Sequence, residues 1–231
     1  MRQRLGRSLT EDVYDQLRLA VLHGDVAAGE RLHLGALAHR YEVSLGVVRE
    51  VVTRLASERL LEATPQAGFR VRALSPRHLA DLTWTRCRIE TLAVTDSLAH
   101  GDTNWEGNLV AAHHVLAVTD VQRHDGSASP EWMNAHRRFH AALVAGSANT
   151  ILLAIRQQLF DEAELYRHRS GDGPEGARRD LGAEHRDLLA AALARDAARV
   201  VDLLVTHIGT TAALVAASTT VATAQPGPPA D

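Results

Sequence analysis

Four histidines in the second half of the chain have the residue type and the spacing to share one metal ion. His136 and His140 are four residues apart, so on a helix both imidazoles project from the same face. His185 and His207 lie on two later segments, each at the edge of an apolar stripe. Helical bundles build metal sites from side chains on facing helices, and imidazole suits Zn²⁺ and Ni²⁺. We therefore predict that these four histidines bind a divalent metal ion.

Two alternatives to this site remain open. Each histidine could be a solvated or hydrogen-bonded residue, with no ion bound. The other alternative is a metal-dependent hydrolase on a helical bundle. Such an enzyme commonly carries H-E-x-x-H, in which the glutamate is the general base, but here Arg137 follows His136. The sequence shows no other well-placed general base, nucleophile elbow or glycine-rich phosphate loop, so we expect no enzyme activity.

Six predicted helices position the histidines. From residue 77 onward, apolar residues recur at three- and four-residue spacing, and strand signals are absent. The predicted helices span residues 77–99, 105–121, 131–145, 151–168, 177–194 and 196–217. In the first of them the inward candidates are Leu79, Leu82, Ile89, Leu92 and Ala93. Residues 218–231 are rich in Thr, Ala and Pro and are predicted to be disordered.

The first third of the chain predicts a winged helix-turn-helix. Thr10 is the expected N-cap of a first helix, and residues 34–41 form a second. A third helix begins after Ser44, whose hydroxyl can accept from an early amide, and its buried stripe is Val48, Val51, Val52 and Leu55. Two short strands around a Pro/Gly tip, within residues 58–72, form the wing. Residues 26–32 are expected to be a turn-rich connection.

The exposed side of the third helix and the wing are the candidates for contacting DNA. A helix suits binding in a DNA groove when its buried face is apolar and its exposed face carries small residues and an arginine. Gly68 permits close backbone approach to a phosphate or the minor groove, with Arg70 beside it. The predicted DNA-binding residues are Ser44, Leu45, Gly46, Arg49, Thr53, Gly68 and Arg70. An ordinary amphipathic helix and a purely structural hairpin are the alternatives.

Composition and charge set the organisation of the chain. The 231 residues are 45% hydrophobic and 23% charged, as in a globular protein. The single Cys87 excludes an internal disulfide, and neither a signal peptide nor a membrane-length apolar run is evident, so we expect a cytoplasmic protein outside the membrane. Residues 1–75 hold 11 arginines against 9 acidic residues, whereas residues 76–231 are acidic. This split and Pro76 predict a flexible N-terminus at 1–8, a DNA-binding domain at 9–75, a helical domain at 76–217 and the tail at 218–231.

The motifs of residues 9–73, in their order, resemble the winged-helix domain of the GntR family of bacterial transcription regulators. The matching residues include Val21–Val26, Gly29–Leu32, Val43–Ser44, Val48–Glu50, Leu60–Leu61, Pro65 and Gly68. The resemblance implies binding to double-stranded operator DNA. After the cap, the family commonly carries Arg, Thr and Pro, where this chain has Leu45, Gly46 and Val47. The missing guanidinium leaves more of the contact to Arg49 and the wing.

Residues 77–215 resemble the FCD ligand-binding domain of the FadR-type branch of this family, an all-helical bundle. The pattern is carried by Arg86, Ile89–Glu90, Phe139–His140, Asn149, Glu184–His185 and Asp196 through His207. The resemblance implies a divalent metal held by an Asp and three His, where small carboxylates bind. By position, His140, His185 and His207 match the three His, and His136 stands where the Asp is usual. Four neutral imidazoles leave the charge of the ion uncompensated, which favours a carboxylate effector.

Arg86 and Asn149 are the effector-binding residues that the resemblance implies. Arg86 can pair bidentately with a carboxylate, or it pairs only with Glu90 one turn further on. The whole sequence thus predicts a mainly α transcription regulator, a repressor whose repression is relieved when its effector binds. As a homodimer, it would hold two winged helices at two operator half-sites. The same regulator with a metal-free effector site is the alternative.

Overall fold

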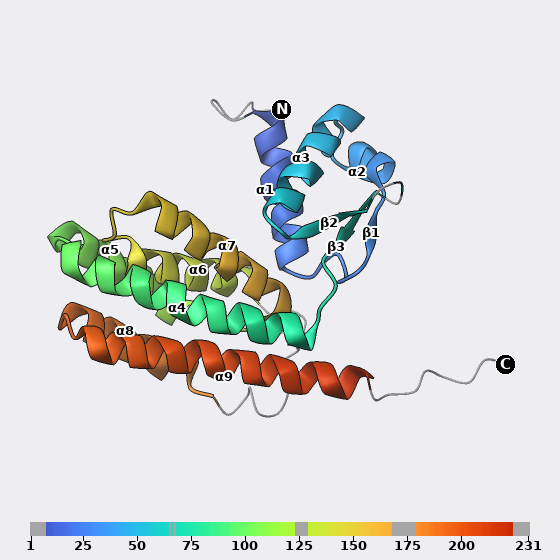
Figure 1. Ribbon diagram of the computed structural model, residues 1–231. Coiled ribbons are helices and arrows are strands. Elements are labelled where there is room, and N and C mark those ends of the chain that lie inside the picture. The colour runs from blue at the N-terminus through green and yellow to red at the C-terminus, as the bar shows by residue number, and fades with distance from the viewer. Residues whose placement is uncertain (1–7, 65, 67, 123–128, 168–178, 224–231) are drawn as a thin grey trace. The chain divides into compact units, whose positions relative to one another are not determined.

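The computed structural model describes residues 8–64, 66, 68–122, 129–167 and 179–223, and side chains as far as residue 217. The chain divides into two compact units, Met1–Ser75 with Glu164–Arg169, and Pro76–Ala163 with Ser170–Asp231. The first is a small α+β unit and the second is a set of long helices (Figure 1). The predicted fold class, a winged helix-turn-helix followed by a helical bundle, is confirmed.

The first unit begins with a helix whose cap differs from the prediction. Ser8 caps α1 (Leu9–Leu22): its Oγ accepts from the Glu11 amide at 3.2 Å, and the Glu11 carboxylate accepts from the Ser8 amide at 3.2 Å. Thr10, the predicted cap, lies inside the helix. A capping box satisfies two backbone donors at once, and only Ser8 has a glutamate three residues ahead.

A three-helix core and a small sheet form the rest of this unit. The further elements are β1 (Arg31–Leu32), α2 (Leu34–Arg40), α3 (Leu45–Ser57), β2 (Leu61–Thr64) and β3 (Gly68–Val71). The stripe of Val48, Val51, Val52 and Leu55 is fully buried against Leu17 and Val21 of α1. These contacts fix the orientation of α3 and leave its opposite side exposed.

The sheet has one strand more than the sequence predicted. Its order is β1-β3-β2, all antiparallel, with Leu32 opposite Phe69 and Ala63 opposite Phe69 on the other side. Residues 31–32 were expected in a turn-rich connection, but that segment pairs with β3. The prediction failed because β1 is only two residues long and acquires its strand character from the distant wing.

The second unit is the predicted set of helices, with bounds close to those expected. Its six described helices are α4 (Pro76–His100), α5 (Thr103–Val118), α6 (Pro130–Val144), α7 (Thr150–Arg167), α8 (Leu181–Leu193) and α9 (Ala197–Thr223). α4 lies beside α9, α5 beside α6, and α8 beside α9 (Figure 1). The core includes Ala93 and Val94 of α4, Phe139 of α6, Leu188 of α8 and Leu204 of α9. Leu92, a predicted core residue, is 58% exposed because Glu90 and Val94 face inward on either side of it.

α6 carries two of the histidines, and its start is well specified. Ser129 caps it by accepting from the Trp132 amide at 3.2 Å, and Pro130 occupies the first turn, where its missing N–H has no role. The buried residues Trp132, Phe139 and Leu143 then fix which face of α6 turns inward. That face includes His136 and His140.

α9 departs from two predictions. It runs to Thr223, so residues 218–223 belong to a helix and not to the predicted disordered tail; residues 224–231 lie outside the described chain. The reason is local: no Pro or Gly lies between residue 217 and Pro226, and alanine favours helix. The segment Ala197–Ala217 is also long and apolar enough to span a membrane, with a mean hydropathy of 1.7, against the expectation of no such run. Length and composition are weak evidence here, since Val200, Leu204 and Ile208 of α9 pack into the bundle core.

Candidate functional site

The four predicted histidines meet inside the helical unit. His136 and His140 come from α6, His185 from α8 and His207 from α9. All four side chains are buried, with between 1 and 5% of their surface exposed. One ring nitrogen of each lies within 4.8 Å of those of the other three. Nitrogens that share one ion at about 2.1 Å lie at most about 4.2 Å from one another, so the four donors would have to move only slightly closer to hold one ion.

The imidazole rings contact one another directly. His140 Nε2 lies 3.1 Å from His136 Nε2, and these ring centroids are 4.4 Å apart. His185 and His207 have centroids 5.0 Å apart, and every other pair in the set lies within 6.0 Å. Nitrogen donors thus converge from three helices. The H-E-x-x-H hydrolase motif finds no support, because Arg137 takes the place of its glutamate and forms an ion pair with Asp161.

Burial favours the neutral form of two of these imidazoles, His140 and His207. It lowers the pKa of His140 well below the usual 6.5, and the neighbouring His207 and His185 and the positive charges of Arg156 and Arg86 lower it further. Burial also lowers the pKa of His207, although its hydrogen bond to Glu184 opposes the shift. A metal ion binds neutral imidazole, so the site offers its nitrogens in the form that coordination requires.

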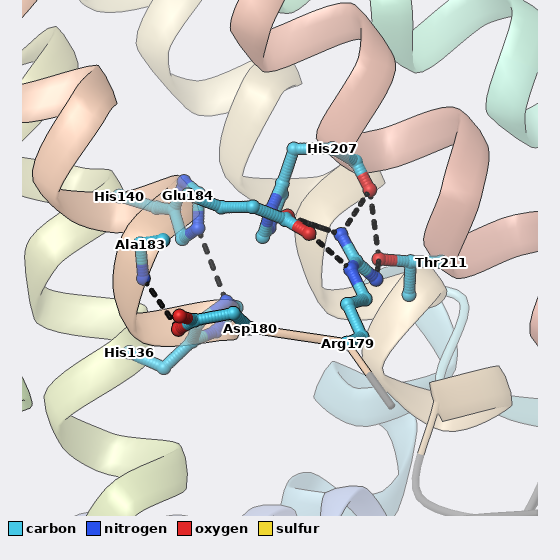
Figure 2. A network of polar contacts seen from close by, with 8 residues as sticks. All are labelled: His136, His140, Arg179, Asp180, Ala183, Glu184, His207 and Thr211. Atoms are coloured by element: carbon cyan, nitrogen blue, oxygen red, sulfur yellow. Dashed lines mark hydrogen bonds and ion pairs between the residues drawn. The ribbon is translucent and has the colours of Figure 1, made fainter. Parts of the chain in front are cut away.

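Glu184 and Arg179 surround His207 with a network of polar contacts (Figure 2). His207 Nδ1 lies 2.7 Å from Glu184 Oε2, and Arg179 pairs with both oxygens of Glu184 at 2.6 Å. Arg179 also donates to the His207 carbonyl at 3.0 Å and to Thr211 Oγ1 at 2.8 Å. Burial raises the pKa of Glu184, but the hydrogen bonds from His207 and Arg179 outweigh it and bring the pKa to about 2.

This network fixes the tautomer of His207. An ionised Glu184 accepts a hydrogen bond from Nδ1–H, which leaves Nε2 with its lone pair for a metal. Arg179 Nη2 also lies 3.1 Å from Nδ1, but Arg179 can only donate and has closer acceptors in Glu184 and the His207 carbonyl. Sequence reasoning missed Arg179; Glu184 was visible only as the residue before His185.

Arg86 lies near the cluster, and a second arginine that the sequence analysis missed lies with it. Arg86 Nε is 3.4 Å from Glu90 Oε1, the pairing one turn on that had been the alternative for this residue. Arg156 of α7 donates through Nε to Glu90 Oε2 at 2.9 Å and is only 2% exposed. Both guanidinium groups lie against Phe160, 4.8 and 4.7 Å from its ring centroid. The Phe160 centroid lies 5.9 Å from that of His140.

Asn149 has a different place. It is exposed at the start of α7, where its Oδ1 accepts from the Leu152 amide at 3.0 Å. This bond caps the helix. We therefore assign Asn149 a capping role and leave it out of the effector site proposed below.

The predicted DNA-contacting residues are all exposed, on α3 and in the wing of the first unit. Ser44 caps α3, with its Oγ accepting from the Val47 amide at 3.3 Å. Leu45, Gly46, Arg49 and Thr53 are exposed, opposite the buried stripe, and Leu45 is 50% exposed. In the wing, Gly68 has φ +82°, a conformation that favours glycine, and the exposed Arg70 donates to the Gly29 carbonyl at 3.3 Å.

Comparison with known proteins identifies a family for each of the two units. Residues 9–71 match the family of bacterial regulatory proteins, gntR family, and residues 81–210 match the FCD domain. The HTH-type transcriptional regulator BphR of Paraburkholderia xenovorans (strain LB400) is 35% identical over 90% of this chain and 86% of the relative. The HTH-type transcriptional repressor GlaR of Escherichia coli (strain K12) is 33% identical over 85% of this chain and 91% of the relative.

Solved structures show the same fold. E. coli McbR/YncC superposes with a TM-score of 0.77 over 93% of this chain and 100% of that chain, at 23% identity. A GntR regulator from Rhodococcus sp. RHA1 superposes with a TM-score of 0.70 over 95% of this chain and 100% of that chain, at 22% identity. The relatives are regulators and not enzymes, in agreement with the sequence prediction. The chain is therefore a DNA-binding transcription regulator of the GntR family, with an FCD domain that follows its helix-turn-helix in the sequence.

Proposed function

We propose that this regulator is a cytoplasmic homodimeric repressor that releases operator DNA when a small carboxylate binds beside a metal ion in its FCD domain. The observation that carries the proposal is the convergence of four buried imidazoles from three helices on one point. The domain bounds of the proposal are residues 9–75 for DNA and 76–217 for effector binding and dimerisation.

Zn²⁺ or Ni²⁺ suits the donor set, since both accept several imidazole nitrogens. His136, His140, His185 and His207 would hold the ion, with His207 oriented by Glu184. When bound, the ion supplies an electrophilic position for a carboxylate oxygen. All four protein ligands are neutral, so the positive charge of the ion favours an anionic effector over a neutral one.

The DNA contacts we propose are Ser44, Leu45, Gly46, Arg49, Thr53, Gly68 and Arg70. Arg49 is the long cationic side chain on the exposed side of α3, and it suits guanine or phosphate. Ser44 would serve mainly by fixing the start of the helix, whose amides can face a phosphate. Leu45 and Gly46 can make only apolar or backbone contacts, so we expect few base-specific hydrogen bonds per half-site.

Control of DNA binding follows from linkage between the two sites. A dimer held by the helical domains would place two winged helices at the spacing of two half-sites. Effector binding would shift the bundle helices and change that spacing or its mobility. Its effect on operator affinity would equal the difference in effector affinity between the two states, typically about 1–3 kcal/mol. Repression, as opposed to activation, has support in the name of the relative GlaR, a transcriptional repressor.

The same regulator without an ion is the second candidate. It has support in the mutual contact of His136 and His140 Nε2, a hydrogen bond that needs no metal, and in the absence of an acidic ligand among the four. Glu184 orients His207 in either case, so the tautomer does not decide between the two forms.

Elemental analysis of the purified full chain, followed by thermal-shift titrations with Zn²⁺, Ni²⁺ and small carboxylates, tests the proposal. We expect about one ion per chain and a further stabilisation by carboxylates that disappears in a His140→Ala/His185→Ala variant. A wild-type protein that is metal-free, indifferent to both ions and still stabilised by carboxylates would select the second candidate. No response to any carboxylate would contradict both.

A further inference from the structure

The guanidinium of Arg156 has a buried donor, Nη2, that is not hydrogen-bonded to any residue that the structure describes. Its Nε donates to Glu90 at 2.9 Å and its Nη1 lies 3.5 Å from Gln157 Oε1, at the limit of a hydrogen bond. Its Nη2 is buried and has no hydrogen-bond partner among the described residues. A buried charged donor without an acceptor is costly, so such a group commonly marks a place where a ligand or water belongs.

The carboxylate beside Arg156 is already shared. Glu90 accepts from Arg156 through Oε2 and from Arg86 through Oε1, so it serves two guanidinium groups at once. The neighbouring acidic residues of α7 have partners of their own: Asp161 pairs with Arg137, and Glu162 lies 3.5 Å from His78. The charge of Arg156 is therefore only partly balanced by the acidic groups whose partners are identified here.

Arg156 is also close to the four-histidine cluster. Phe160 connects the two: the Arg156 Cζ lies 4.7 Å from the centroid of its ring, and that centroid lies 5.9 Å from His140 and 6.1 Å from His136. The charge of Arg156 contributes to the lowered pKa of His140, after burial and the other histidines. The buried cation and the histidines thus lie near the same aromatic ring.

We infer that Arg156, held by Glu90, is a second anion-binding point of the effector site, and that the effector is a dianion such as a short dicarboxylate. One carboxylate would face the metal ion and the other would accept from Arg156. This inference rests on the proposed function, because it takes the histidine cluster as the first anion-binding point. A monocarboxylate would leave the Arg156 donor without an acceptor.

Calorimetric titration of the Zn²⁺-loaded full chain with matched acids tests the inference. The pairs are butanoate with butanedioate, pentanoate with pentanedioate and hexanoate with hexanedioate. For at least one pair we expect the dicarboxylate to bind at least about tenfold more tightly, because a charge-assisted hydrogen bond to a buried guanidinium forms only with the second carboxylate. Equal affinities within every pair would overturn the inference but leave the proposed carboxylate sensing intact. No binding of either kind would overturn both.

Three variants locate the effect. Arg156→Met should reduce dicarboxylate affinity to that of the matched monocarboxylate, while monocarboxylate affinity changes less than about threefold. Glu90→Gln keeps an oxygen that can hold Arg156 but removes the competing negative charge, so it should strengthen dicarboxylate binding, a gain that misfolding cannot produce. Arg199→Met, at an exposed arginine paired with Asp202, is the matched control and should change neither. Unchanged discrimination in folded Arg156→Met, or weaker dicarboxylate binding in folded Glu90→Gln, would assign Arg156 a structural role only. If Arg156→Met fails to fold, Arg156→Lys decides by the same comparison, because it keeps the buried charge but removes the Nη2 donor.

Discussion

Replacing Glu184 by alanine removes the acceptor that orients His207. In the wild-type chain the carboxylate lies 2.7 Å from Nδ1 and is itself held by two contacts of 2.6 Å from Arg179. Without it, the imidazole can adopt the other tautomer, and the Arg179 guanidinium lies 3.1 Å from Nδ1 with its main acceptor gone. Loss of such an orienting group typically weakens metal binding by about 10- to 100-fold. This corresponds to about 1.4–2.7 kcal/mol.

Competition for Zn²⁺ against a chromophoric chelator at constant pH measures this loss. The matched control is Glu106→Ala, since Glu106 also pairs with an arginine, Arg195 at 2.5 Å, and its side chain is 35% exposed against 31% for Glu184. Glu106→Ala should lower thermal stability but leave Zn²⁺ affinity within about twofold of wild type. Wild-type affinity in Glu184→Ala, or an equal loss in both variants, would refute the argument that Glu184 acts through His207.

Three further predictions concern stability. Ser44→Ala removes the cap of α3 and should lower the free energy of unfolding of the DNA-binding unit by about 1 kcal/mol, measured by urea denaturation; an unchanged midpoint would contradict the cap. Metal-free protein should lose stability as the pH falls below about 6.5, since His140 and His207 have lowered pKa values when folded and the unfolded chain then binds more protons. Each of these histidines adds a limiting slope of about 1.4 kcal/mol per pH unit, so His140→Gln should have a shallower pH dependence than wild type. Removal of the ion with a chelator should lower the melting temperature reversibly, by an amount equivalent to about 2.7 kcal/mol for Zn²⁺ at about 100 times its Kd; a melting curve unaffected by chelator would contradict metal binding by the wild-type protein.

The histidine cluster could be predicted from the sequence because its information is largely local. His136 and His140 are related by helix periodicity alone, and His185 and His207 each lie at the edge of an apolar stripe. The stripe of α3 and the Ser44 cap were predictable for the same reason. Helix ends were less accurate: the capping box at Ser8 replaced the cap expected at Thr10, and α9 continued past residue 217.

Contacts between distant residues set the limit of the sequence analysis. Arg156 is hydrogen-bonded to Glu90, which is 66 positions away in the sequence, and Arg179 is hydrogen-bonded to His207, 28 positions away. No local spacing in the sequence predicts either pair. A charged residue inside an apolar helix, with Phe160 one turn later, was the only signal for Arg156. β1 likewise depends on the remote strand β3. These interactions become visible only when the packing of the helices and strands is known.

The central claim is that an anion at the four-histidine site controls DNA binding. Fluorescence anisotropy with an operator selected from random duplex DNA tests it most directly, with metal-loaded wild type and the His140→Ala/His185→Ala variant compared with and without a saturating carboxylate. We predict that the carboxylate weakens operator binding by about 5- to 150-fold in the metal-loaded wild type and has no effect on the variant. Equal operator affinity with and without the carboxylate in the wild type, or the same release from the variant, would contradict the claim.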